Sequence, residues 1–231
     1  MRLTRSLAAL MAAGCVASVA AAGPAAARTP APPGYPMAKA QALRSVDYQL
    51  LLLRVDAFVL TTDRAVPSAD STALLATINA DISALTTLRT TMRGETTLTG
   101  IQSDVTTLAG YHVTDFVLPQ TWLVVSSDEL TAGAAQATPM SSRLQAAITA
   151  AQTAGRDVTA ANAVFSDFTT QLSSAQSDAL AVHDSAVALV AGAAANGATI
   201  AADSAQLRKA AAELAAAARD ARSITRSLHS R

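Results

Sequence analysis

The sequence predicts an all-α protein, an elongated antiparallel helical bundle with coiled-coil-like packing and long C-terminal helices. Three observations support this. Ala and Leu dominate a chain of 231 residues that is 51% hydrophobic but only 3% aromatic, which favours helices packed closely through small side chains. Apolar residues recur every three or four positions along most of the chain. No segment shows the sustained alternation of polar and apolar residues that is typical of a strand.

Residues 1–27 have the parts of a secretory signal peptide. A basic start, MRLTR, precedes the apolar run SLAALMAAGCVASVAAA and a small-residue site with Ala25 and Ala27. We expect cleavage after Ala27 and an exported protein, extracellular or associated with the cell envelope. One alternative stays open, because AAGC is similar to the end of a bacterial lipobox, and acylation of Cys15 would make this a lipid-anchored envelope lipoprotein.

Composition excludes several classes of function for the exported chain. After cleavage no Cys remains, so we expect no disulfide, no thiolate nucleophile and no Cys metal site. Cleavage removes two of the 17 basic residues, Arg2 and Arg5, and none of the 17 acidic ones, so the net charge becomes about −2. A nearly neutral chain is not expected to bind nucleic acid. No apolar stretch of about 18 residues follows the signal, so we expect no transmembrane helix.

The remaining chain divides into a Pro-rich disordered spacer, 28–36, and a single α-helical bundle domain, 37–231. The first helix should end near 64–67, and its apolar row is Leu43, Val46, Leu50, Leu53, Ala57 and Leu60. A second row widens this face and predicts that it is broadly buried: Leu51, Val55, Phe58 and Val59. A second helix, capped by Ser68 or Asp70, should end at Gly94.

A third helix should start near Thr97 and meet Pro119, which is unfavourable inside a helix. We favour a kink between Asp115 and Pro119, with the helix continuing through Trp122. The alternative is extended chain over 118–125 and a new helix at Ser126. A bend there could form an apolar pocket lined by Phe116 and Trp122, which suggests a second hypothesis, a binding module for an apolar ligand. Further on, Thr138-Pro139 either starts a new helix or kinks a longer one.

The next helix has the clearest pattern in the chain. With Gly155 as a stop and Asp157 as a cap before it, a strict heptad row follows: Val158, Ala161, Phe165, Phe168, Leu172, Ala175, Ala179, Val182, Ala186 and Leu189. GAAANG, 192–197, breaks this helix. A last helix, about 200–229, carries a row of Leu207, Ala211, Leu214, Ala218, Ala221 and Leu228, with Ile224 beside it.

The sequence brings no catalytic, cofactor-binding or metal-binding set together, so we do not expect an enzyme. His112 and Asp115 share a helical face, but a metal site needs at least three ligands. His183 stands apart, with Asp184 pointing to another part of the helix, and His229 lies near the end of the chain. Gly-rich phosphate loops and nucleophile elbows are also missing from the sequence.

One charged surface remains as a candidate interaction site. Arg219, Arg222 and Arg226 share a face of the last helix, whereas the stretch 157–203 before it contains several Asp and no basic residue. Either the two neighbouring helices attract each other, or the basic end contacts anionic envelope polymers or lipid head groups.

The stretch DFVLPQTWLVVSSDEL, followed by RLQAAITAAQTAGRDVTAA and a long Ala/Leu helix, resembles uncharacterised secreted helical proteins of bacteria, including high-GC Gram-positives. The resemblance covers about 43–228 and implies the fold and export, with no activity, cofactor or binding residue. The sequence therefore suggests an exported, non-enzymatic structural or protein-interaction bundle. Its partner is unknown; an envelope polymer, another helical protein and self-association all fit.

Overall fold

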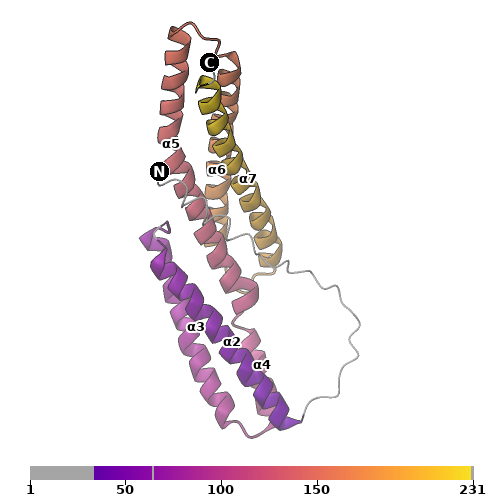
Figure 1. Ribbon diagram of the computed structural model, residues 1–231. Helices are drawn as coiled ribbons and strands as arrows, with labels where there is room; N and C mark the ends of the chain where they lie inside the picture. The colour runs from indigo at the N-terminus through magenta and orange to yellow at the C-terminus, as the bar shows by residue number, and fades with distance from the viewer. Residues whose placement is uncertain (1–33, 64, 230–231) are drawn as a thin grey trace.

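The computed structural model describes residues 34–63 and 65–229, and nearly all of them are helical (Figure 1). The elements are α2 (Tyr35–Thr62), α3 (Ser68–Gly94), α4 (Leu98–Ala109), the π-helical segment η1 (Val113–Val117), α5 (Leu118–Thr153), α6 (Thr159–Val187) and α7 (Asn196–His229). The predicted all-α fold of packed helices is confirmed. The predicted signal peptide, including Cys15, and most of the spacer lie outside the described residues; the last two spacer residues, Tyr35 and Pro36, belong to α2.

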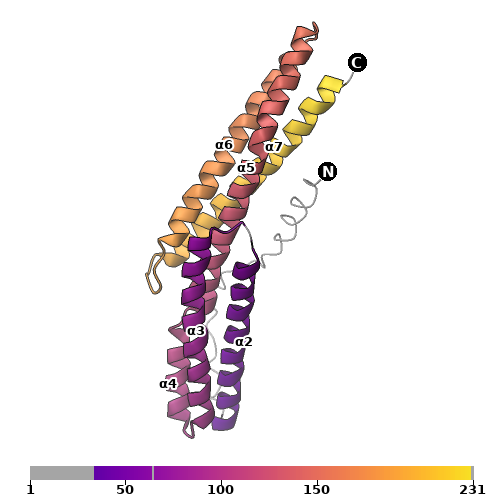
Figure 2. The same cartoon turned by 90° about the vertical axis from the view of Figure 1, so that its left-hand side faces the viewer.

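The helices form two bundles with separate hydrophobic cores, arranged end to end along the molecule (Figures 1 and 2). The first bundle contains α2, α3, α4, η1 and one side of the start of α5. The second contains α5, α6 and α7, and α6 runs antiparallel to the other two. Two residues near the joint, Leu74 of α3 and Leu189 after α6, pack against both cores. The described part of the predicted 37–231 domain is thus a helical fold with two cores, and its elongation comes from stacking the two bundles.

Helix α5 joins the two bundles because it takes part in both. It has 36 residues, a length of about 54 Å. Near its start the burial extends all round the helix, and the adjacent residues Val124 and Val125 pack in different cores. Side chains on this segment are therefore buried whichever way they point, and the carboxylate of Asp128 is one of them.

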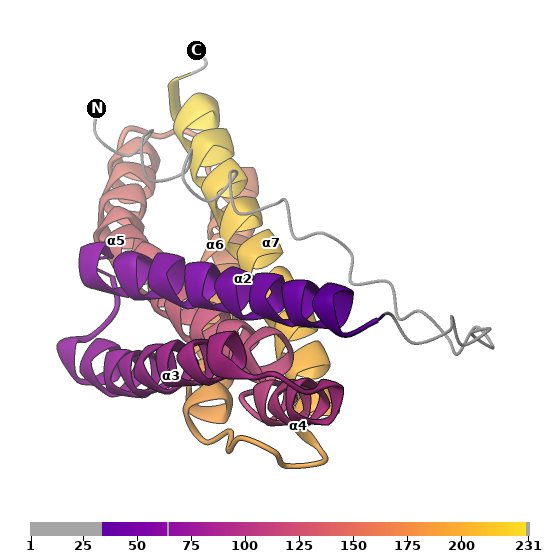
Figure 3. The same ribbon diagram turned by 90° about the horizontal axis from the view of Figure 1, so that it is seen from below.

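Helix α2 packs through one face only, and this corrects the sequence prediction. Val46, Leu50 and Leu53 are buried as expected. The widening row is exposed instead: Leu51, Val55, Phe58 and Val59. The cause is that α3 and α4 lie along the same side of α2 (Figure 3), so none of the described helices covers the opposite side.

The helix is interrupted before Pro119, at residues 110–112, rather than kinked at the proline. Helix α4 ends at Ala109, and His112 adopts a left-handed conformation with φ of 50°. The π-helical turn follows, in which the Val117 and Leu118 amides bond to the His112 and Val113 carbonyls. Pro119 therefore falls in the first turn of α5, where a missing N–H costs little. The alternative of extended chain over 118–125 is wrong, because α5 continues helically through Trp122.

Other helix boundaries follow the predicted signals closely. Pro139 lies inside α5, so the longer-helix alternative at Thr138-Pro139 is the observed one. Gly155, with φ of 77°, ends the turn after α5, and the Asp157 carboxylate accepts the Thr159 amide at 2.9 Å. Helix α3, by contrast, begins at Ser68 with Pro67 as its N-cap residue, so neither Ser68 nor Asp70 occupies the predicted N-cap position.

The predicted apolar row of α6 is mostly buried, and Phe165 and Leu189 are only partly buried. Helix α7 starts at Asn196, slightly earlier than expected, and its core row is Leu207, Ala210, Leu214, Ala217, Ala221 and Ile224.

Of the described helices, none combines the length and hydropathy that crossing a lipid bilayer requires.

Candidate functional site

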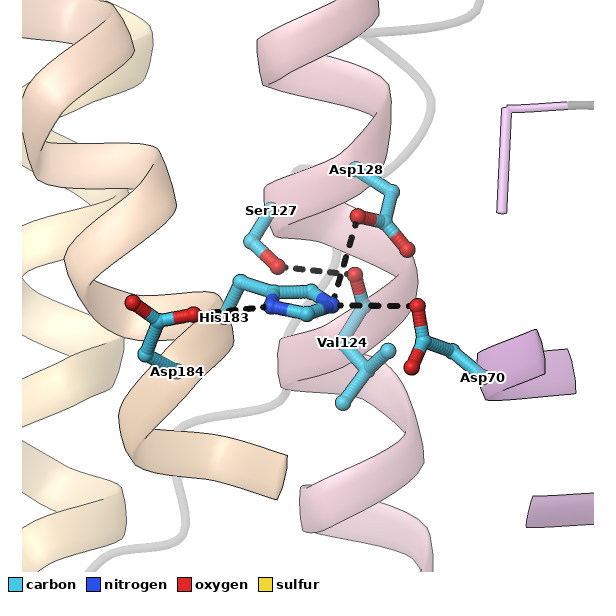
Figure 4. A network of polar contacts seen from close by, with 6 residues as sticks. All are labelled: Asp70, Val124, Ser127, Asp128, His183 and Asp184. Atoms are coloured by element: carbon cyan, nitrogen blue, oxygen red, sulfur yellow. Dashed lines mark hydrogen bonds and ion pairs between the residues drawn. The ribbon is translucent and has the colours of Figure 1, made fainter. Parts of the chain in front are cut away.

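Three ionisable side chains from three helices meet where the two bundles join (Figure 4). The His183 Nε2 atom on α6 lies 3.3 Å from Asp70 Oδ2 on α3 and 3.7 Å from Asp128 Oδ1 on α5. The other ring nitrogen, Nδ1, lies 3.4 Å from Asp184 Oδ1. We call Asp70, Asp128 and His183 the joint cluster.

Each member reaches this place through the local structure of its helix. Asp70 lies in the first turn of α3, where a carboxylate is favoured by the helix dipole. Asp128 lies on the part of α5 that is enclosed by both bundles. His183 follows the fully buried Val182, so it lies at the edge of the α6 core row and points toward α5 and α3.

Burial and neighbouring charge shift the proton affinities of the joint cluster. Burial raises the pKa of Asp128 to about 6; the charge of His183 opposes this rise, while Asp70 and Asp63 add to it. Burial lowers the pKa of His183, but the hydrogen bond with Asp184 and the charges of Asp128 and Asp70 outweigh it, so the net shift is upward.

A second carboxylate pair lies close by. Burial, the charge of Asp63 and a hydrogen bond with Asp63 all raise the pKa of Glu129. Within the described part of the chain, no Lys or Arg forms an ion pair with Asp70 or Asp128. Among the described residues, the basic side chain paired with these two aspartates is therefore one histidine, and a carboxylate-rich place of this kind attracts a proton or a cation.

The Asp128 carboxylate is incompletely paired. Its side chain is 9% exposed, and its Oδ2 atom has no hydrogen-bond partner among the described residues. The neighbouring Ser127 hydroxyl does not help, since it donates to the Val124 carbonyl at 2.8 Å. Burying a carboxylate oxygen without a hydrogen-bond donor costs free energy, so such an atom is rare unless a proton or a cation compensates it.

Sequence reasoning missed this cluster. It treated His183 as isolated and Asp184 as pointing away, whereas the Asp184 carboxylate contacts the His183 ring. One available signal was Asp128 itself, a carboxylate that follows the largely apolar stretch TWLVVSS. The partners, however, come from helices that are far apart in sequence, so spacing alone could not bring them together.

The other histidines stay outside this site. His112 Nδ1 lies 2.9 Å from Asp115 Oδ2, as the shared face predicted, but both side chains are substantially exposed and no third ligand from the described part of the chain joins them. His229 Nδ1 lies 2.6 Å from the Thr225 carbonyl, at the end of the described part of α7.

The predicted basic face of α7 is solvent-exposed. Arg222 and Arg226 donate to carbonyls one turn back, at 3.1 and 3.4 Å, and Arg219 is exposed beside them. Across the described residues the ion pair between α6 and α7 is made by Lys209 and Asp178, at 2.8 Å. The predicted attraction between the two neighbouring helices is therefore made by Lys209, while the three arginines form no ion pair with a described residue of α6.

Phe116 and Trp122, the residues of the predicted apolar pocket, face different cores. Phe116 is buried in the first bundle, while Trp122 is partly buried against the second. The two rings therefore do not line one pocket beside Pro119. An open, shallow groove lies elsewhere, between α5 and α6, lined by Ser141, Gln145, Thr149, Phe165 and Thr169 among others.

Comparisons of the chain with models of protein families, with curated proteins and with solved structures found no match.

Proposed function

We propose that this chain is an exported, non-enzymatic helical protein of the cell envelope or extracellular space that binds an acidic helix of another protein along α2. The observation that carries the proposal is the exposed apolar row of α2, formed by Tyr48, Leu51, Val55 and Phe58. Each of these side chains is more than half exposed. Their spacing of three and four residues is that of a helix-pairing seam.

The charges beside the row favour an acidic partner. Arg44 and Arg54 are exposed on α2, and neither forms an ion pair with another described residue. The nearby acid Asp47 is already held by Arg89, at 2.6 Å. Two copies pairing through this face would bring the arginines of both chains together, so a second copy fits less well than a helix that carries carboxylates.

A synthetic helix provides a direct test. Two labelled amphipathic peptides share one apolar face, but one carries Glu and the other Lys beside that face. Fluorescence polarisation should show binding of the Glu peptide and at least tenfold weaker binding of the Lys peptide. The double variant L51S/F58S should lose at least tenfold in affinity, because it removes two of the four contacts of the row.

Leu180→Ser is the matched control, since Leu180 is an exposed apolar residue on α6, outside the row. Its affinity should equal that of the wild type. Equal binding of both peptides, or no loss in L51S/F58S, would exclude the proposed face. A dimer mass in light scattering that becomes a monomer mass in L51S/F58S would assign the face to a second copy instead.

The basic face of α7 supports a second candidate function, contact with an anionic polymer of the envelope. Arg219, Arg222 and Arg226 are exposed without acidic partners among the described residues. Sedimentation with anionic cell-wall polymer at low salt should fall in the triple Gln variant and weaken with added salt. Unchanged sedimentation would rule this contact out.

Export and processing are tested by the intact mass of the native protein in the medium and in the envelope fraction. A mass starting at Arg28 in the medium supports a secreted protein. A mass starting at an acylated Cys15 in the membrane fraction would replace this with a lipoprotein.

A further inference from the structure

We propose that Asp70, Asp128 and His183 form a binding site for a divalent transition-metal ion, best matched by zinc, at the joint between the two bundles. Each residue offers one ligand atom, and the three atoms lie within 4.8 Å of one another. The site uses other residues than the α2 row, so this inference is independent of helix binding.

The distances between the ligand atoms fit a tetrahedral ion. With metal–ligand bonds of about 2.0 Å, two ligands of a tetrahedral zinc lie ~3.3 Å apart. The His183 Nε2 atom lies 3.3 Å from Asp70 Oδ2 and 3.7 Å from Asp128 Oδ1. The second distance is slightly longer than the tetrahedral value, so the Asp128 carboxylate would move toward the ion on binding, and a water molecule would complete the four ligands.

The unpartnered oxygen of Asp128 is the second observation that points to a ligand. The side chain is more than nine-tenths buried, and Figure 4 shows its carboxylate directed at the His183 ring and the Asp70 carboxylate. A buried carboxylate needs a compensating positive charge. A divalent ion between Asp70 and Asp128 balances their two charges and gives the carboxylate group a partner.

The histidine is oriented as a metal ligand. The Asp184 carboxylate lies on the Nδ1 side at 3.4 Å, which favours a proton on Nδ1 and directs the Nε2 lone pair at the two aspartates. A carboxylate behind a coordinating histidine is a recurrent arrangement in zinc proteins. An imidazole ligand also favours zinc over magnesium or calcium, which prefer sites made only of oxygen.

The site is open enough for an ion to enter and placed so that binding has a structural effect. The His183 and Asp70 side chains are 19% and 24% exposed. The three ligands belong to α3 of the first bundle, α6 of the second, and α5, which both share. A bound ion would therefore link the bundles directly and stabilise the joint, since metal binding to the folded state adds to stability.

The test titrates chelator-treated full-length protein with zinc chloride by calorimetry. We expect one zinc ion per chain and a higher melting temperature with zinc. D128N, D70N and H183Q should each lose at least tenfold in zinc affinity. D184N should lose less, because Asp184 only orients the histidine. Cobalt(II) in place of zinc should give the strong visible absorption of a tetrahedral site, which D128N abolishes.

H112Q is the matched control, because it alters another His–Asp pair that lacks a third ligand. It should keep full zinc binding. Circular dichroism identifies any variant that fails to fold. If D128N or H183Q does not fold, the zinc affinity of D70N decides the test, because Asp70 is the most exposed of the three ligands. The proposal is overturned if zinc does not bind stoichiometrically, if the folded ligand variants bind like the wild type, or if H112Q abolishes binding.

Discussion

The His183 Nε2 atom lies 3.3 Å from Asp70 Oδ2, and this contact joins the first turn of α3 to the last turns of α6 across 113 residues of sequence. The contact links the two bundles at a place where α5 packs in both hydrophobic cores. Polar contacts at such a joint set the relative position of the bundles, which apolar packing through one helix fixes only in part.

The first prediction concerns the strength of this contact without metal. In a double-mutant cycle with D70N and H183Q, in excess chelator, we expect a coupling free energy of about 0.5–1 kcal/mol. The same cycle on His112 and Asp115, which are more exposed, should give a smaller value. Urea unfolding monitored by circular dichroism measures both. A coupling below about 0.3 kcal/mol at the joint would mean that the two side chains are neighbours without an energetic link.

The helices were predictable from the sequence, whereas the joint was not. The α6 row follows from local spacing, because its period of 3.5 fits a helix whatever its partners are. The exposed face of α2 was wrongly expected to be buried, because burial depends on how many helices cover α2, and no local pattern contains that information. Likewise, Asp70, Asp128 and His183 meet because α5 takes part in both cores and brings Asp128 beside α3 and α6.

The second prediction concerns the pH dependence of stability. Burial raises the pKa of Asp56 from 3.8 to about 6, although the Thr121 hydroxyl works in the opposite direction. The folded state thus binds a proton that the unfolded state has released, so stability is highest below about pH 4 for this group and falls as the pH rises through about 6. In D56N this fall should be smaller, and the melting temperature at pH 7.5 should rise by about 2–4 °C, the equivalent of ~1 kcal/mol for a chain of this size.

Thermal melts of wild type, D56N and the control D167N at a series of pH values test this. Asp167 is exposed on α6, so D167N should follow the wild-type profile. A wild-type profile that rises between pH 5 and 7, or a D56N profile parallel to that of the wild type, would contradict the assignment to Asp56.

The third prediction concerns the small-residue packing between α6 and α7. Ala179 is fully buried in the core row of α6, and nearby Ala181 is exposed on the same helix. Replacing Ala179 by Leu inserts three heavy atoms into a filled core and should cost 1–3 kcal/mol, roughly. A181L, with the same change in composition, should stay within about 0.5 kcal/mol of the wild type. Chemical denaturation separates the two; equal effects would mean that the α6 seam is loosely packed.

The fourth prediction tests how closely α5 and α7 approach. A Cβ atom added to Gly133 on α5 would lie 3.2 Å from the Leu214 Cδ2 atom on α7, a tight contact with the flexible end of a side chain. Glycine inside a helix costs about 1 kcal/mol relative to alanine. In G133A this gain should be largely offset by the displacement of Leu214, so stability should change by less than about 0.5 kcal/mol. G133L should lose at least ~1 kcal/mol, because the small displacement no longer suffices.

The control is G197A, since a Cβ at Gly197 on α7 meets no atom within 4 Å and has no packing cost. It should be at least as stable as the wild type. If G133L melts at the wild-type temperature, then Leu214 has room to move aside, and the approach of α5 to α7 does not depend on glycine. If G133A is already strongly destabilising, then α5 and α7 approach each other more closely at Gly133 than the 3.2 Å distance to Leu214 Cδ2 indicates. Either result would show that Leu214 does not set the tolerance at this position.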